Sequence, residues 1–83
     1  MWYVYMIMCN DGTLYTGITT NVSRRIAEHN TSNKGAKYTR TRRPVKLVWQ
    51  CTSGDRSSAS KEEYRIKKLK KSEKLKLIVN KLK

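Results

Sequence analysis

The 83-residue chain lacks the features of a secreted, membrane-spanning or multidomain protein. Its two cysteines, Cys9 and Cys51, form no Cys-x-x-Cys pair, so we expect neither a disulfide framework nor a zinc knuckle and predict two small buried residues. No run approaches the roughly 18 apolar residues that cross a bilayer, and the first residues carry neither a basic flank nor a small-residue cleavage site. We therefore expect one cytoplasmic domain spanning residues 1–83.

Acidic residues are also scarce: six Asp and Glu stand against 19 Lys and Arg, which gives a formal net charge of +13. The surplus is uneven, because residues 1–30 are neutral overall, residues 31–60 carry +6 and residues 61–83 carry +7. A neutral platform that bears a basic remainder favours a polyanionic partner, above all nucleic acid. A merely solvated lysine-rich face is the alternative, and membrane binding is disfavoured because the basic helix has no large aromatic face.

The N-terminal third predicts a β-hairpin. Residues 2–9 are apolar or aromatic, and residues 13–18 resume this pattern after the turn signal Asn10-Asp11-Gly12. A two-residue turn and a three-residue loop compete, and we favour the loop, which places Gly12 in the left-handed conformation and pairs Tyr5 with Gly17. We expect one face of this hairpin to be core and the other a site. The expected core face carries Trp2, Val4, Met6, Met8, Leu14 and Ile18. The expected site face carries Tyr3, Tyr5, Tyr15 and Gly17.

The remaining chain predicts a helix over about residues 22–30, a cationic loop over 31–43, a strand over 45–51 and helices over about 58–71 and 72–82. The order β-β-α-β-α-α predicts an α+β fold, with a small three-stranded antiparallel sheet flanked by helices. Thr20, Asn21 or Ser23 can cap the first helix and Ser72 the last. Expected core positions are Val22, Ile26 and Ala27; Val45, Leu47 and Trp49, or else Val48 and Cys51; and Leu75, Ile78, Val79 and Leu82.

Several motifs resemble the GIY-YIG nuclease superfamily, and more closely its small stand-alone bacterial members, the UPF0213-type proteins. They are Tyr3-Val4-Tyr5, Tyr15-Thr16-Gly17, then Arg25, His29, Gly35-Ala36-Lys37-Tyr38-Thr39 and Glu63-Tyr64-Arg65-Ile66-Lys67. Each three-residue motif alone is weak, but the ordered set covers nearly the whole chain and is specific. The chain departs from the pattern at Tyr3, which replaces the first glycine of the family but is not a reactive position.

The resemblance implies a metal-dependent endonuclease that hydrolyses phosphodiesters of structured or damaged DNA, in repair or recombination. It assigns Tyr5 and Tyr15 to flank the attacking water, one of them as general base, and Arg25 to hold the scissile phosphate. His29 would orient or protonate nearby groups, and Glu63 would carry Mg²⁺ or Mn²⁺. A tyrosine with a pKa near 10 is roughly three units, or about 4 kcal/mol, from acting as a base at neutrality. We expect the cationic surroundings to lower that pKa.

The residues themselves leave other interpretations open. The i, i+4 spacing puts Arg25 and His29 on one helix face, but His29 could instead interact with the last carbonyls of its helix. Glu63 could close a capping box with Ser60 or pair with Lys67, and Glu62 could replace it as the ligand. The family pattern favours Glu63 because Ala59, a small residue, stands four positions ahead. A lone carboxylate with waters suits a hard ion such as Mg²⁺. Without the resemblance, both tyrosines would be ordinary sheet residues.

The cationic loop supplies the predicted contacts to nucleic acid, with Tyr38 able to stack on a base or sugar. The partner is expected to be DNA, with RNA as an alternative, no membrane is involved, and a monomer is favoured. A second hypothesis is a nucleic-acid-binding module on the same scaffold with little or no turnover, and a third is a basic structural protein of a ribonucleoprotein. The predicted nucleic-acid-binding residues are Lys34, Lys37, Tyr38, Arg40, Arg42 and Arg43.

Overall fold

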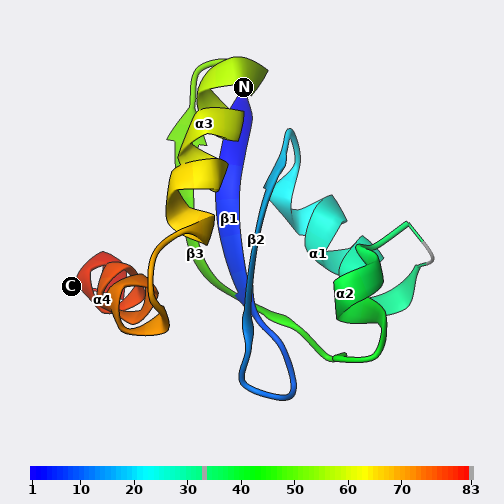
Figure 1. Ribbon diagram of the computed structural model, residues 1–83. Helices are drawn as coiled ribbons and strands as arrows, with labels where there is room; N and C mark the ends of the chain where they lie inside the picture. The colour runs from blue at the N-terminus through cyan, green and yellow to red at the C-terminus, as the bar shows by residue number, and fades with distance from the viewer. Residues whose placement is uncertain (33, 83) are drawn as a thin grey trace.

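The computed structural model describes residues 1–32 and 34–82 and confirms the α+β fold (Figure 1). The three strands form one antiparallel sheet in the order β2-β1-β3. Along the chain the elements are β1 (Trp2–Met8), β2 (Leu14–Thr19), α1 (Val22–Thr31), α2 (Lys37–Arg40), β3 (Lys46–Ser53), α3 (Arg56–Lys67) and α4 (Lys71–Leu82).

The hairpin adopts the predicted three-residue loop. The amide of Cys9 donates to the carbonyl of Thr13 at 2.8 Å, and Gly12 has a φ of +83°, a conformation that side chains with a Cβ rarely adopt. β1 and β2 therefore pair Tyr5 with Gly17, as the sequence predicts. This register fixes which side chains of the hairpin share a face.

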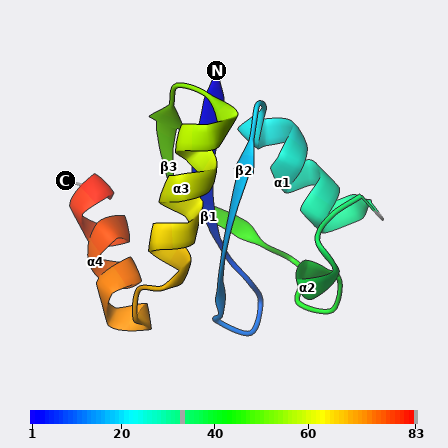
Figure 2. The ribbon, with the colours of Figure 1, turned by 45° about the horizontal axis from the view of Figure 1, so that its top comes forward.

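Helices cover both faces of the sheet. α3 and α4 lie on one side, and α1 with α2 lies on the other (Figures 1 and 2). Val4 and Met6 of β1 are fully buried beneath α3 and α4, whereas Tyr5 and Ile7 belong to a second buried cluster on the α1 side. The tyrosine face of the hairpin is covered as well, because α1 closes over it and buries Tyr5.

β3 divides its side chains between the two faces because its pairing with β1 is irregular. Met6 pairs with Trp49 and Ile7 with Leu47, so one residue of β3, Val48, has no opposite partner. Such a bulge reverses the alternation of side chains. Val45 packs in the cluster on the α1 side, while Trp49 packs in the cluster under α3 and α4. Of the two alternatives expected for this strand, Val48 and Cys51 both pack against the cluster under α3 and α4, so that set is confirmed, whereas the set Val45, Leu47 and Trp49 is divided between the two faces.

The helix ends differ from the sequence expectation at several positions. Asn21 caps α1, its side chain accepting from the amide of Arg24 at 3.0 Å, as expected among the three candidates. Asp55 caps α3 in the same way through Ser58, so α3 starts earlier than expected and ends at Lys67. α4 begins at Lys71, so Ser72 is not its cap.

Three core expectations in the helices are wrong, because Ala27, Leu75 and Val79 are exposed. Ala27 is exposed, because α1 turns its Ile26 face toward the sheet. On α4, Leu77 and Ile78 pack against the core while Val79 is 51% exposed, so the buried stripe is rotated from the expected one. The side chain of Leu82 lies outside the described residues. Among the described helices, none combines the length and apolarity needed to cross a membrane.

Candidate active site

Tyr5 lies in the layer between the sheet and α1, directly over Gly17. Tyr5 is only 1% exposed, and a Cβ on Gly17 would come within 2.5 Å of the Tyr5 hydroxyl oxygen and 2.7 Å of its Cζ. Real Cβ atoms do not approach other atoms so closely, so this ring position requires glycine at residue 17. The motifs Tyr3-Val4-Tyr5 and Tyr15-Thr16-Gly17 therefore pack as one unit, in which Gly17 makes room for the Tyr5 ring.

His29, from the last turn of α1, completes the enclosure of Tyr5. Its Nε2 lies 2.7 Å from the Tyr5 hydroxyl, and the imidazole is fully buried. Its other nitrogen, Nδ1, lies 3.0 Å from the hydroxyl of Thr39 and 3.3 Å from the amide of Ala36. The ring is thus bonded between β1 and the segment around α2, and the alternative in which it serves the carbonyls of its own helix is wrong.

Arg25 stands one turn before His29 on α1 and reaches the same hydroxyl. Its guanidinium donates to Glu28 at 3.0 Å and to the carbonyl of Lys34 at 2.7 Å, and it lies close enough to the Tyr5 hydroxyl to act on the pKa of that group. The side chain is 25% exposed, so part of the guanidinium faces solvent. Arg25 therefore joins the buried tyrosine to the protein surface, where a phosphate could reach it.

The protonation states of this cluster contradict the expectation of an acidified tyrosine. Burial raises the pKa of Tyr5 to about 12, outweighing the influence of Arg25, which acts to lower it. Burial, reinforced by the charge of Arg25, lowers the pKa of His29 to about 4. Both groups are accordingly neutral near pH 7. The +13 surplus does not reverse this, since desolvation is the larger effect at Tyr5.

Tyr15, on β2, borders the same histidine from another side. Its ring meets His29 edge-on at 5.4 Å between centroids, and it stacks with Tyr38 at 5.9 Å and an interplanar angle of 22°. The ammonium of Lys67 lies 5.8 Å from the Tyr15 ring centroid. Tyr15 is half-buried, so of the two tyrosines it is the one nearer to solvent.

Glu63 and Glu62 face different neighbours, although they are adjacent on α3. The charge of Glu63 acts on Tyr5, whereas that of Glu62 acts on Cys51, and Glu62 is paired with Arg65. Because α3 is capped at Asp55, Glu63 lies inside the helix and forms no capping box with Ser60. It pairs instead with Lys67 at 3.5 Å, as its i, i+4 spacing predicts.

The donor set fits a hard divalent ion that the protein holds only in part. Within residues 1–32 and 34–82, no group of three or more His, Cys, Asp or Glu side chains could enclose a metal ion. Glu63 alone offers a partly exposed carboxylate, and the Lys67 ammonium beside it shows that a cation fits there. Mg²⁺ is commonly bound through one or two carboxylates, waters and substrate phosphates, which matches this arrangement.

The segment expected as a cationic loop contains the short helix α2 and is held by its own basic residues. Arg42 bonds Asp11 at 3.0 Å, with its guanidinium 4.0 Å from the ring centroid of Tyr38. Arg43 donates to the carbonyls of His29 and Ser32. Of the six residues predicted to bind nucleic acid, these two arginines are half-buried structural ties. Lys34, Lys37 and Arg40 are exposed, and Tyr38 is 38% exposed.

Two residues at this site escaped the sequence interpretation in different ways. Thr39 was part of the family motif but carried no assigned role, because a threonine in an aperiodic segment gives no signal of its own. Lys67 was considered only as a helix partner of Glu63, although its ammonium also reaches Tyr15. The register of α3 could have indicated this second contact only if the position of β2 beside α3 were known.

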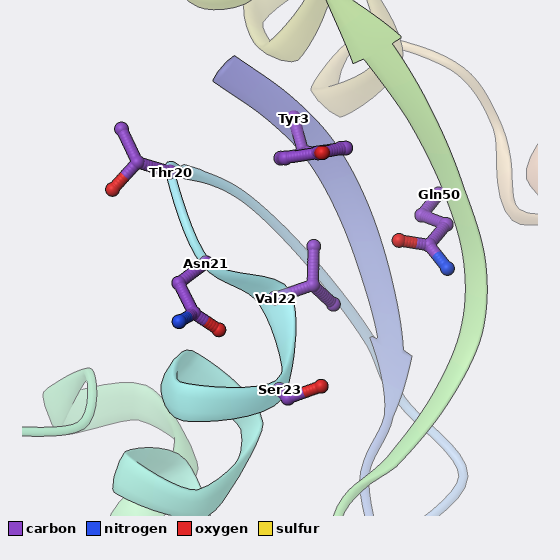
Figure 3. A pocket seen from close by; sticks show the side chains of 6 residues that line it. All are labelled: Tyr3, Thr20, Asn21, Val22, Ser23 and Gln50. Carbon is purple, nitrogen blue, oxygen red and sulfur yellow. The ribbon is translucent and has the colours of Figure 1, made fainter. Parts of the chain in front are cut away.

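Tyr3, which replaces the first glycine of the family pattern, lines a separate surface cavity of about 300 Å³ (Figure 3). Gln50 of β3 and residues 20–23 at the start of α1 complete its lining. None of the five predicted catalytic residues contributes to this cavity. The departure at Tyr3 therefore changes the surface next to the first strand and leaves the Tyr5 cluster intact.

The sequence of this chain matches a known protein family over most of its length. The sequence profile described as the GIY-YIG catalytic domain matches residues 1–76. The chain belongs to the GIY-YIG family. The matched range includes the buried tyrosine cluster described above, and the family is one of nucleases.

Individual relatives of this GIY-YIG chain are UPF0213 proteins. It is 62% identical over 77 residues to the UPF0213 protein DP2720 of Desulfotalea psychrophila, covering 93% of this chain and 70% of that protein. It is 55% identical over 76 residues to the UPF0213 protein SH2523 of Staphylococcus haemolyticus, covering 92% of each. The solution NMR structure of the UPF0213 protein BH0048 from Bacillus halodurans superposes with a TM-score of 0.62 at 45% identity, covering 98% of this chain and 86% of that one.

Proposed function

We propose that this GIY-YIG protein is a metal-dependent endonuclease that hydrolyses phosphodiester bonds of DNA in repair or recombination. The observation that carries the proposal is the convergence of chemically suited groups from separate segments. The hydroxyl of Tyr5 is bonded to His29 and lies close to Arg25, and the charge of Glu63 acts on the same tyrosine. A sheet residue in a purely structural role would not need a cation and an imidazole beside its hydroxyl, together with the charge of a carboxylate that acts on it.

In this proposal Arg25 binds the scissile phosphate through the part of its guanidinium that faces solvent. The Tyr5 proton passes to His29, and the Tyr5 oxygen then takes a proton from a water molecule that attacks phosphorus. The bond from phosphorus to the leaving oxygen breaks, and that oxygen takes a proton from solvent. A divalent ion bound by Glu63 supplies positive charge to the phosphate and to the leaving oxygen.

The resting site is far from this ionised state. The proton would pass from Tyr5, with a pKa of about 12, to His29, with a pKa of about 4, so the transfer is uphill by roughly eight units, or about 11 kcal/mol. That cost exceeds the roughly 4 kcal/mol of an ordinary tyrosine, so the proton transfer must be coupled to substrate binding. Tyr15 is the other candidate base, and its partial exposure gives water a shorter route to it.

The basic remainder of the chain would hold the DNA backbone, with Lys34, Lys37 and Arg40 as exposed contacts near the site. If about six phosphates are contacted, the logarithm of the affinity falls with the logarithm of salt concentration at a slope of roughly −5. We propose a monomer that acts on DNA in the cytoplasm, with the net charge of +13 attracting it to the polyanion.

The test is nicking of supercoiled plasmid and of branched DNA with Mg²⁺ or Mn²⁺, using Glu63→Gln and, as the matched control, Glu62→Gln. We expect Glu63→Gln to lose at least about 100-fold in rate and Glu62→Gln to stay within about threefold, because the charge of Glu63 acts on Tyr5 whereas Glu62 is paired with Arg65. Equal rates in wild type and Glu63→Gln would show that the nicking does not arise at this site.

A nucleic-acid-binding module without turnover is the second candidate, and one observation favours it. Lys67 already neutralises Glu63, and Tyr5 and His29 are both neutral, so the resting site is not poised for reaction. DNA binding with the expected salt dependence but no cleavage with either ion would establish this alternative. Binding to RNA in place of DNA would change the substrate class in either case.

A further inference from the structure

Thr39 stands behind His29 and completes a chain of hydrogen bonds that starts at the candidate catalytic tyrosine. Thr39, His29 and Tyr5 are all at most 1% exposed, so each polar atom must find its partner within the protein. The hydroxyl of Thr39 lies 2.8 Å from the carbonyl of Ala36 and 3.0 Å from Nδ1 of His29. A carbonyl can only accept, so at this bond the threonine is the donor.

The direction of this bond bears on which ring nitrogen of His29 carries the hydrogen. Once the single hydrogen of Thr39 is given to the carbonyl of Ala36, its oxygen is left to accept, and the partner at Nδ1 must then carry a hydrogen. In a neutral imidazole with a proton on Nδ1, Nε2 has none and can only accept. The hydroxyl of Tyr5, 2.7 Å away, is its donor.

At the other end of this series of hydrogen bonds, the contact between Arg25 and Tyr5 is consistent with the same donor-to-acceptor direction. Arg25 has only donor groups, so its contact with Tyr5 requires the tyrosine oxygen to accept there. The Tyr5 hydrogen then points to Nε2 of His29. One contact opposes this order: the amide of Ala36 donates to Nδ1 at the longer distance of 3.3 Å, and that bond requires an Nδ1 without a hydrogen. Thr39 and the Ala36 amide thus compete for one ring nitrogen.

We infer that Thr39 is a positioning residue that holds His29 in the Nδ1–H tautomer, so that Nε2 is ready to receive the Tyr5 proton. The pKa of His29, lowered by burial to about 4, keeps the ring neutral at physiological pH, so a single tautomer can be defined. The inference rests on the proposed nuclease function only for its catalytic consequence. There, the proton given to Nε2 returns to solvent after the Tyr5 oxygen has taken one from water.

The segment that carries Thr39 is built to fix its position. Gly35 packs so tightly that a Cβ would lie 2.8 Å from the Cα of His29 and from the carbonyl oxygen of Glu28. Arg43 donates to the carbonyls of His29 and Ser32, which ties the far end of the segment to the end of α1. The hydroxyl of Thr39 is therefore presented to the ring from a backbone that is held on both sides.

The chain contains a single histidine, so its tautomer can be read without assignment ambiguity. The experiment is a long-range ¹H–¹⁵N correlation spectrum of the imidazole at pH 7 in wild type, Thr39→Val and Thr39→Ser. We expect an Nδ1–H ring in wild type and in Thr39→Ser, which keeps the hydroxyl. In Thr39→Val only the amide of Ala36 remains at Nδ1, so we expect the Nε2–H ring.

An Nε2–H ring in wild type, or an unchanged ring in Thr39→Val, would overturn the inference. If Thr39→Val does not fold, the wild-type spectrum still decides, because the Ala36 amide acting alone requires the Nε2–H form. For cleavage, we expect Thr39→Val to lose about 100-fold or more in rate and Thr39→Ser to retain most of it. Absence of cleavage in wild type would refute the proposed function and leave the tautomer result standing.

Discussion

Replacing Gly17 by alanine tests the packing on which the candidate site depends. The new Cβ would lie 2.5 Å from the Tyr5 hydroxyl oxygen, 2.7 Å from Cζ and 3.0 Å from Cε1. Ordinary contacts between such atoms are about 3.5–4.0 Å, so the ring must move by about 1 Å. Tyr5 is 1% exposed and enclosed by α1, so a movement of that size strains its 2.7 Å bond to His29.

The magnitude follows from two opposed effects. Overpacking a filled core costs about 1–3 kcal/mol, and leaving a buried polar group without its partner costs about 1–3 kcal/mol more. Alanine recovers up to about 1 kcal/mol by restricting the unfolded chain. We therefore expect Gly17→Ala to lose about 2–4 kcal/mol in free energy of unfolding. At 4–8 °C per kcal/mol for a domain of this size, the melting temperature falls by roughly 10 °C or more.

The assay is thermal and urea unfolding followed by circular dichroism, with Gly54→Ala as the matched control. A Cβ on Gly54 meets nothing within 4 Å, so this variant should stay within about 0.5 kcal/mol of wild type. Adding Tyr5→Phe to Gly17→Ala removes the closest contact but keeps the one at Cζ, so we expect only partial recovery. Equal melting temperatures for Gly17→Ala and Gly54→Ala would refute the packing argument.

Three other outcomes follow from the structure. The pKa of His29 is about 4 in the folded state and near 6.5 in the unfolded state, so between these pH values the unfolded state binds more protons. Acidification from pH 6.5 to 5 should therefore lower the free energy of unfolding by about 1.5 kcal/mol. Urea titrations across that range check this, and His29→Gln should lose the slope. Arg42→Ala should cost about 1 kcal/mol through its contacts with Asp11 and Tyr38, against almost nothing for exposed Lys37→Ala in the same titration. Fluorescence anisotropy with a labelled duplex should show the logarithm of the affinity falling with the logarithm of the salt concentration at a slope near −5. A slope near zero would show that the basic surface does not bind the DNA backbone.

The hairpin was predictable from sequence because its signals are local. The turn Asn10-Asp11-Gly12 and the alternation of side chains on both strands agree on one register, which the structure adopts. The bulge at Val48 was not predictable, since it depends on how β3 pairs with a strand about 40 residues away. The bulge does not affect the predicted order of strands and helices, because each of these elements has its own periodic pattern in the sequence.

At the candidate site, the spacing of Arg25 and His29 correctly indicated a shared helix face. The protonation of Tyr5 was wrong for a physical reason: net charge is visible in the sequence, whereas the burial that raises the pKa of this tyrosine arises only when α1 packs over the sheet. Thr39 was overlooked for a related reason, because its hydroxyl acquires a role only through its distance from a ring ten residues earlier. The sequence motifs indicated the candidate groups of the site better than the residues that position them.

The central claim is that the buried hydroxyl of Tyr5 takes part in phosphodiester hydrolysis. Single-turnover cleavage of DNA at saturating protein, compared between wild type and Tyr5→Phe, tests it most directly, with anisotropy measuring binding in parallel. The account predicts binding within about twofold of wild type and a cleavage rate at least about 100-fold lower, since the phenylalanine keeps the ring that fills the space over Gly17 and loses only the proton-carrying atom. Cleavage by Tyr5→Phe at the wild-type rate would contradict it.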